Sequence, residues 1–211
     1  MKTSNAKNQK LNLTPFEAEI EPDPIWEAGV DEAGRGPLAG PVVVAAVILP
    51  TDYDLKSLDD SKRLTALKRE QLAPQIEAQA IAFAVEFVAA EEIDRVNILQ
   101  ATMNGMQRAV ENLSPAPVRV LIDGNRAPDL CCEVKTVIGG DRLIPSISAA
   151  SILAKVYRDR LMVSLHRQYP GYGFDRHKGY PTALHLERLK ALGPCAIHRQ
   201  SFAPVRKARR L

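Results

Sequence analysis

Four acidic side chains occupy positions where the strands of a predicted sheet end. Asp31 and Glu32 end the first apolar strand pattern, Asp123 ends a central strand, and Asp141 comes directly after Gly139-Gly140. Sites in α/β proteins are assembled at strand ends. Carboxylates that converge there raise one another's pKa unless a cation neutralises them. The chemistry that this pattern favours is therefore binding of Mg2+ or Mn2+ by hard oxygen ligands.

Each of these carboxylates also has a simpler interpretation as a turn former or helix cap. Asp123-Gly124-Asn125 taken alone is typical of a turn. Adjacent residues of a strand point to opposite faces, so Asp31 and Glu32 share a site only if the strand ends or bulges there. Spacing alone leaves open whether the four meet.

A glycine-rich loop and several basic residues could bind a polyanion beside these acids. The loop Gly34-Arg35-Gly36 lacks two Cβ atoms, so its backbone can approach a sugar closely, although a tight turn between strands is the alternative. Four basic side chains could reach phosphates or could equally be solvated surface charges, as is usual for Lys and Arg: Lys62, Lys155, Arg158 and Lys178.

Hydrophobic periodicity predicts alternating strands and helices. Strands are expected at 25–30, 41–49, 81–87, 118–122 and 133–138, and helices at 65–78, 90–113, 146–168 and 181–192. The run 42–49 is apolar on both faces, which is typical of a central strand. Close early strands followed by strands separated by helix indicate an α/β protein with a mixed sheet.

Composition narrows the class of protein. No secretory signal is recognisable, and the longest apolar run is far shorter than the roughly 20 residues that span a bilayer. The cysteines, Cys131, Cys132 and Cys195, form neither a disulfide framework nor a zinc pattern. We therefore expect a cytoplasmic protein, with no membrane partner.

Charge is distributed unevenly along the chain. Residues 1–140 carry 14 basic against 21 acidic residues, whereas residues 141–211 carry 14 basic against 4 acidic ones. The C-terminal third therefore either presents a basic surface to a polyanion or is a solubilising segment. The domain organisation that we expect is a flexible leader at 1–24, a catalytic domain at 25–205, and a basic tail at 206–211 that adds salt-sensitive affinity.

A series of motifs resembles the type 2 ribonuclease H family, and ribonuclease HII within it. The motifs occur in the family's order and are Gly29 to Pro41 (GVDEAGRGPLAGP), Asp60-Ser61-Lys62, Asp123-Gly124-Asn125, Gly139-Gly140-Asp141, Ser148 to Lys155 (SAASILAK), His177 to Thr182 (HKGYPT) and His198 to Phe202 (HRQSF). Together they span nearly the whole of residues 25–205. Adjacent first carboxylates separate the chain from type 1 enzymes, and Asp141 with a short leader separates it from ribonuclease HIII.

The resemblance implies a ribonuclease H-like fold, with a five-stranded mixed sheet flanked by helices and a helical C-terminal extension. It also implies that Asp31, Glu32, Asp123 and Asp141 gather around two divalent ions, Mn2+ or Mg2+. The implied activity is endonucleolytic hydrolysis of the RNA strand of RNA–DNA hybrids and cleavage 5′ of ribonucleotides embedded in duplex DNA. The products would carry 3′-hydroxyl and 5′-phosphate ends.

The same resemblance assigns substrate contacts. Gly34, Arg35 and Gly36 would read the 2′-hydroxyl, and Tyr180 would pack on the sugar at the RNA–DNA junction, although a half-buried tyrosine that covers a helix start is the commoner arrangement. The expected partners are the hybrid and ribonucleotide-containing DNA. No obligate protein partner is expected, and a monomer would suffice.

Three other functions remain in view. A nuclease of the same fold that acts on DNA differs in lacking the glycine loop and Tyr180. A non-catalytic nucleic-acid-binding module would leave the carboxylates unexplained, and a small-molecule phosphate binder would need a different glycine spacing. Metal-dependent hydrolysis needs no histidine, so we expect structural or phosphate-contact roles for His177, His185 and His198, and a surface position for His166.

Overall fold

The computed structural model describes residues 25–55, 58 and 64–209. Its centre is a five-stranded sheet with the order β3-β2-β1-β4-β5. The strands are β1 (Glu27–Ala33), β2 (Val42–Ile48), β3 (Ala82–Val88), β4 (Arg119–Asp123) and β5 (Glu133–Val137). β2 pairs antiparallel with both β1 and β3, whereas β4 pairs parallel with both β1 and β5. The predicted mixed sheet is therefore confirmed.

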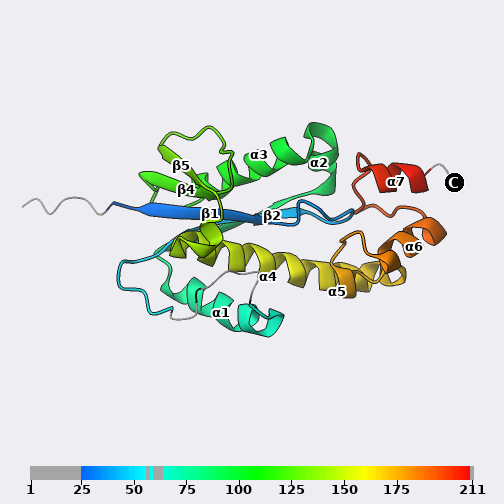
Figure 1. Cartoon of the computed structure of the whole chain (residues 1–211), viewed down its shortest axis with the longest axis horizontal. Coiled ribbons are helices and arrows are strands. Elements are labelled where there is room, and N and C mark those ends of the chain that lie inside the picture. Colours follow the sequence, from blue (N-terminus) through cyan, green and yellow to red (C-terminus); the bar gives the residue numbers. More distant parts are fainter. Residues whose placement is uncertain (1–24, 56–57, 59–63, 210–211) are drawn as a thin grey trace, which may run out of the picture.

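Helices cover both faces of this sheet (Figure 1). One face carries α2 (Ala90–Val96) and α3 (Ile98–Glu111), and the other carries α1 (Ala66–Gln79) and the long α4 (Pro145–Gln168). Alternate residues of β2 separate accordingly. Val44 and Ala46 pack in the cluster with Met106 of α3, whereas Ala45 and Val47 pack in the cluster with residues of α1 and α4. Burial on both faces is why this strand is apolar throughout.

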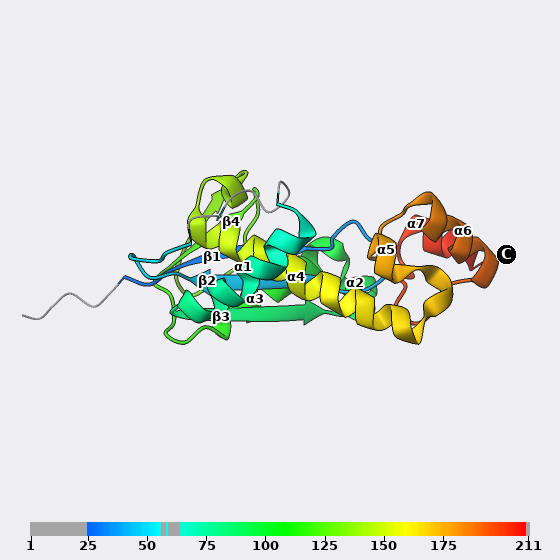
Figure 2. The same ribbon diagram turned by 90° about the horizontal axis from the view of Figure 1, so that it is seen from below.

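The C-terminal part of the chain is a group of short helices at one end of the sheet (Figure 2). It contains the 3-10 turn η2 (Pro170–Tyr172), α5 (Phe174–His177), α6 (Ala183–Leu192) and α7 (Ala203–Ala208). A small core of Ala39, Met162, Tyr172 and Phe174 joins η2 and α5 to α4 and to the segment after β1. α4 is thus common to the sheet and to the helical extension, as Figure 2 shows.

Three predicted boundaries were wrong in detail. The helix expected at 90–113 is two helices, because Asn97 adopts a positive φ of 73° and its side chain accepts hydrogen bonds from the N–H groups of Leu99 and Gln100. β1 continues through Asp31 and Glu32 instead of ending before them. α6 begins after the cap residue Thr182, so Pro181 precedes the helix.

The expected leader at 1–24 lies outside the described residues. The expected boundary between domain and tail at 205/206 lies inside α7, whose residues Arg206 and Lys207 are exposed. None of the helices in the described ranges is both long enough and apolar enough to cross a membrane.

Candidate active site

The parallel register of β1 and β4 brings Asp31 to Asp123. The pairing ends at Val30 opposite Ile122. One further step along both strands leads to the two aspartates, which therefore emerge side by side at the same edge of the sheet. Both of them line a cavity of about 230 Å3 together with Glu32 and Gly34. The sheet topology thus gathers three of the four predicted carboxylates in one cavity.

Asp31 lies deepest among these carboxylates. It is 5% exposed and it faces α4, where Ser151 hydrogen-bonds to its side chain. Burial raises the pKa of Asp31 well above its ordinary value, and the negative charges of Glu32 and Asp123 raise it further, while the bond from Ser151 lowers it. The ionised form of Asp31 is therefore disfavoured, and a bound cation would stabilise it.

Glu32 reaches the same cavity although it follows Asp31 directly in the strand. Its backbone N–H donates to Oδ1 of Asp31 at 2.7 Å, and its side chain lies 3.4 Å from Nη1 of Arg35. Among the described residues, the pairing of β1 with β4 ends at Val30. Because β4 is no longer paired with β1 at this point, the side chain of Glu32 is not confined to one face of the sheet. Glu32 therefore lines both this cavity and a second one that contains Asn125.

Asp141 is adjacent to this group but does not line the cavity. It lies in the 3-10 turn η1 (Gly140–Arg142), is 1% exposed, and has Oδ1 at 3.9 Å from Nε of Arg142. The preceding residue makes the connection, because the N–H of Gly140 donates to Oδ1 of Asp123 at 2.8 Å. The backbone of Asp141 is therefore tied to the carboxylate of Asp123, while its own carboxylate is buried.

The donor set of the cavity suits a hard divalent cation. All three lining carboxylates offer oxygen, the ligand that Mg2+ and Mn2+ prefer. In the described part of the chain, no three acidic, histidine or cysteine side chains already form a ligand cluster. Mutual repulsion of carboxylates opposes such convergence when no cation is present.

The loop Gly34-Arg35-Gly36 lies beside Tyr180 at the mouth of the cavity. Gly34 has a φ of +96°, and Gly34 and Tyr180 both line the cavity. A Cβ on Gly36 would lie 3.8 Å from Cε1 of Tyr180. Tyr180 is 38% exposed, so part of it remains accessible to a ligand.

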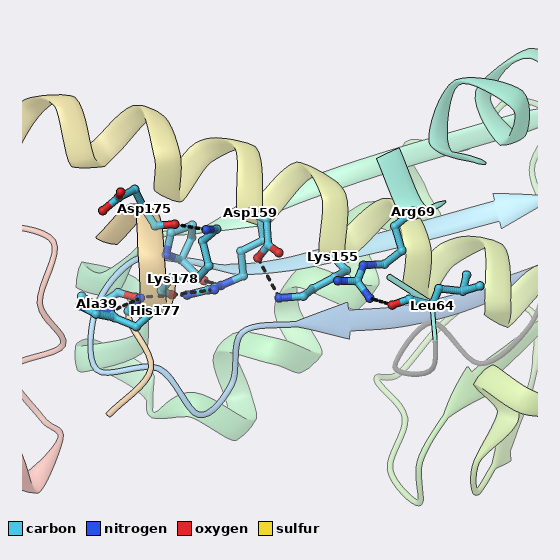
Figure 3. Close-up of polar contacts among 11 residues, drawn as sticks. Ala39, Leu64, Arg69, Lys155, Asp159, Asp175, His177 and Lys178 are labelled. Atoms are coloured by element: carbon cyan, nitrogen blue, oxygen red, sulfur yellow. Dashed lines mark hydrogen bonds and ion pairs between the residues drawn. The ribbon is translucent and has the colours of Figure 1, made fainter. Parts of the chain in front are cut away.

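Three basic side chains lie alongside α4, with Lys155 between Lys178 and Arg69 (Figure 3). Lys155 lines the cavity and donates to Oδ1 of Asp159 at 2.8 Å. Lys178 donates to the backbone oxygen of Asp175. The remaining expected contact from this group, Lys62, lies outside the described residues.

Arg158 corrects one of our sequence predictions. A phosphate contact was expected for it, but its side chain is fully buried. Its guanidinium donates to the backbone oxygens of Pro41 and Ala39 and of Lys178. Helical spacing from Lys155 placed both residues on α4 correctly, but it could not distinguish an outward side chain from one directed at a neighbouring loop.

Sequence reasoning missed three residues of this region. Ser151 bonds to Asp31, Arg69 of α1 lines the cavity, and Arg199 is buried against the glycine loop. Ser151 and Arg199 lie inside quoted motifs, so their presence in a motif was the available signal. Arg69 offered none, because it lies outside every quoted motif.

The histidines of the C-terminal helices have structural positions, as expected. His177, His185 and His198 are buried, and Nε2 of His185 lies 3.1 Å from Nε2 of His198. Burial lowers the pKa of all three, that of His198 to about 4. None of them lines the carboxylate cavity. His166 is only half-buried, with Nδ1 at 3.3 Å from Asp175.

Comparison with known proteins gives a consistent result. The family model described as Ribonuclease HII matches residues 28–205. The ribonuclease HII of Burkholderia mallei is 59% identical over 180 residues, which are 85% of this chain and 84% of that protein. The ribonuclease HII of Burkholderia thailandensis has the same identity and coverage.

Solved structures agree on the fold. The ribonuclease H2 of Pyrococcus horikoshii superposes with a TM-score of 0.75 at 27% identity and covers 87% of this chain and 97% of its own. The RNase HII of Archaeoglobus fulgidus, solved in complex with PCNA, has a TM-score of 0.71 at 29% identity, with coverage of 87% and 96%. Bst-RNase HIII, solved with Mn2+, shares the fold at 20% identity and a TM-score of 0.72, covering 87% of this chain and 69% of its own. This chain has the ribonuclease H fold, is a ribonuclease H hydrolase and belongs to the ribonuclease HII family.

Proposed function

We propose that this protein hydrolyses the RNA strand of RNA–DNA hybrids and cuts on the 5′ side of ribonucleotides embedded in duplex DNA. The products are a 3′-hydroxyl and a 5′-phosphate. The observation that carries this proposal is the cavity that unites Asp31, Glu32 and Asp123 with the glycine loop and Tyr180. Such a cavity combines groups for phosphodiester chemistry with groups that can contact a sugar.

In this proposal Asp31, Glu32, Asp123 and Asp141 hold two divalent cations, Mn2+ or Mg2+. Bound ions of this kind lower the pKa of a water molecule and stabilise charge on the departing oxygen. Asp31 contributes a carboxylate whose raised pKa makes neutralisation by a cation favourable. Ser151 orients that carboxylate from α4, and Gly140 orients Asp123 through its backbone N–H. Asp141, whose carboxylate is buried and does not line the cavity, completes the proposed ligand set.

Recognition of RNA requires the 2′-hydroxyl to be read. We assign this to the backbone of Gly34-Arg35-Gly36, where the missing Cβ atoms allow close approach. Tyr180 packs on the sugar at the junction, with Nζ of Lys155 5.8 Å from its ring centroid. Lys155, Lys178 and the loop residue Arg35 contact phosphates, as does Lys62. We propose that cleavage requires no obligate protein partner.

The decisive experiment is cleavage of a DNA duplex that carries one ribonucleotide, with and without a chelator. We expect one cut 5′ of the ribonucleotide that needs added Mn2+ or Mg2+, and no cut in the all-DNA duplex. Equal cleavage of both duplexes would favour a DNA nuclease of the same fold. Binding without cleavage in the presence of either metal would favour a non-catalytic module.

A further inference from the structure

Two arginines far apart in the sequence are buried behind the glycine loop. Arg158 lies in α4, whereas Arg199 follows α6, and both side chains are 0% exposed. In the described ranges neither forms an ion pair with a carboxylate. Burial lowers the pKa of each guanidinium, and the charge of Arg158 contributes to lowering the pKa of Arg199 to about 9. Arginine side chains stay protonated in proteins, so both are charged. Two buried like charges are costly, and they persist only if hydrogen bonds offset the loss of hydration.

Backbone oxygens provide those hydrogen bonds. Arg199 donates from Nε to Gly40 at 3.0 Å, from Nη1 to Arg35 at 2.9 Å and from Nη2 to Gly34 at 2.6 Å. Its three kinds of nitrogen each hold a different carbonyl of one segment. The planar guanidinium, which carries five N–H donors in a fixed fork, is suited to this task, and an ammonium group is not.

Arg158 holds the other end of the same segment and joins it to Tyr180. Nε donates to Pro41 at 3.0 Å, Nη2 to Ala39 at 3.2 Å and Nη1 to Lys178 at 3.0 Å. Lys178 has a positive φ of 51°, a conformation that costs energy for a residue with a Cβ. Cζ of Arg158 also lies 5.7 Å from the centre of the Tyr180 ring. The two arginines thus connect the loop to the segment that carries the tyrosine.

The N–H groups of the glycine loop contrast with its carbonyls, which accept hydrogen bonds from the buried arginines. Within the described ranges, the N–H groups of Gly34, Arg35 and Gly36 donate no hydrogen bond to protein acceptors. Gly34 permits this geometry, because a Cβ there would lie 2.0 Å from Nε of Arg158. A backbone whose carbonyls are fixed on one side offers its N–H groups as a prearranged set of donors for oxygen atoms of a ligand.

We propose that Arg158 and Arg199 are positioning residues for ribose recognition. They fix the carbonyls of the 34–41 segment so that the N–H groups of residues 34–36 meet the 2′-hydroxyl and its neighbouring phosphate, in register with Tyr180. This inference rests on the proposed function. It adds that discrimination between RNA and DNA depends on guanidinium geometry in the interior, at side chains that touch no substrate.

The test separates charge from geometry by using Arg199→Lys and Arg158→Lys. Affinity is measured without divalent metal for two duplexes that differ by one 2′-hydroxyl. We expect the wild-type preference for the ribonucleotide duplex to fall roughly 10- to 100-fold, the scale of a missing charged hydrogen bond, while affinity for the all-DNA duplex stays unchanged. Arg160→Lys is the matched control, because Arg160 lies on the same helix, is partly exposed and pairs with Glu70.

The outcomes are distinguishable. Folded lysine variants that keep the wild-type preference overturn the positioning role and leave the proposed function intact. A wild-type protein with no preference for the ribonucleotide duplex, together with cleavage of both duplexes, overturns the proposed function itself. A general loss of affinity for both duplexes also overturns the inference, because it indicates a merely structural role.

Should the lysine variants fail to fold, amide hydrogen exchange on the wild-type protein gives an independent answer. The N–H groups of residues 34–36 are expected to exchange readily in the free protein. The ribonucleotide duplex should protect them more than the all-DNA duplex does. Equal protection by both duplexes would contradict the assignment of these N–H groups to the sugar.

Discussion

Two clusters of like charge lie on either side of the glycine loop, and they are neutralised in different ways. On one side Asp31, Glu32 and Asp123 crowd together around a cavity. On the other side Arg158 and Arg199 are buried together. Each of these carboxylates has a protein donor beside it, yet burial and the neighbouring negative charges still raise the pKa of Asp31. The guanidiniums have a backbone oxygen at every kind of nitrogen.

The difference indicates which cluster binds a ligand. A cluster of like charges whose hydrogen bonds are all made by the protein needs no ligand, and it supports the structure around it. A cluster whose mutual repulsion is not fully offset by the protein, and that opens to a cavity, is stabilised by an external counter-ion. The acidic cluster is therefore the candidate for chemistry, and the basic cluster the candidate for its scaffold.

Removing one charge from the acidic cluster should have the largest effect. Asp31→Asn is expected to lower turnover by about 10²- to 10³-fold, the scale for groups that stabilise transition-state charge. The metal-free variant should unfold at no lower temperature than wild type, because the neutral amide avoids the burial cost that raises the pKa of Asp31. Asp52→Asn on an exposed turn is the control. Full turnover by folded Asp31→Asn would contradict the assignment of the chemistry to the acidic cluster.

Tyr180 lies between the two clusters, so its ring should affect discrimination more than chemistry. Tyr180→Ala is expected to cost about 1–3 kcal/mol of junction preference, the range for base–aromatic stacking. Tyr180→Phe should retain most of that preference, because the ring and not the hydroxyl makes the contact. The measurement is the ratio of kcat/KM for a junction substrate and an all-RNA strand. An unchanged ratio in Tyr180→Ala would remove the tyrosine from recognition.

Acid should weaken the scaffold on the basic side. The N–H of Gly179 donates to Nδ1 of His177, and His185 contacts the backbone oxygen of Tyr180. The folded protein keeps these rings neutral, with the pKa of His198 lowered from 6.5 to about 4. Their contribution to stability is therefore complete above pH 6.5 and disappears as the pH falls toward 4.

Denaturant unfolding at several pH values measures this decline. We expect a smaller pH dependence in His185→Gln, because one titrating ring is removed. The variant His166→Gln, in which the half-buried His166 is replaced, should behave as wild type. A free energy of unfolding that stays constant between pH 6.5 and 4 would show that the histidines do not support the loop.

The exposed cations of α7 should have the smallest effect. Replacing Arg206 and Lys207 by Gln is expected to lower the slope of log K against log salt by at most about 0.9 for each phosphate that these side chains neutralise. Cleavage at low salt should be unaffected, since α7 lies outside both clusters. An unchanged slope would mean that this helix does not meet the duplex.

Local patterns were sufficient to predict most elements of this fold. The two-faced apolar run of β2 and the strand ends at Asp123 followed from periodicity and from glycine positions. The meeting of Asp31 with Asp123 required the register of two strands that are remote in sequence. Such pairing depends on tertiary contacts, and only the family resemblance supplied it in advance.

The error over Arg158 has a different cause. A helical pattern gives the face on which a side chain lies, but the loop that it meets comes from another part of the chain. The segment 39–41 turns its carbonyls toward α4, and this makes an interior position favourable for a cation. Sequence alone treats arginine as an exposed residue, because the acceptors that allow its burial are backbone atoms and carry no sequence signal.

The length of α4 determines where this protein can accept an inserted residue. The helix carries Ser151 beside the acidic cavity and Arg158 beside the glycine loop, roughly 10 Å apart along its axis. Under the proposed function, α4 acts as a spacer that fixes how far the bond to be cut lies from the ribose that the loop contacts. One residue inserted between them would rotate everything beyond it by about 100°. Insertions in surface loops should be accepted, whereas this interval should admit none.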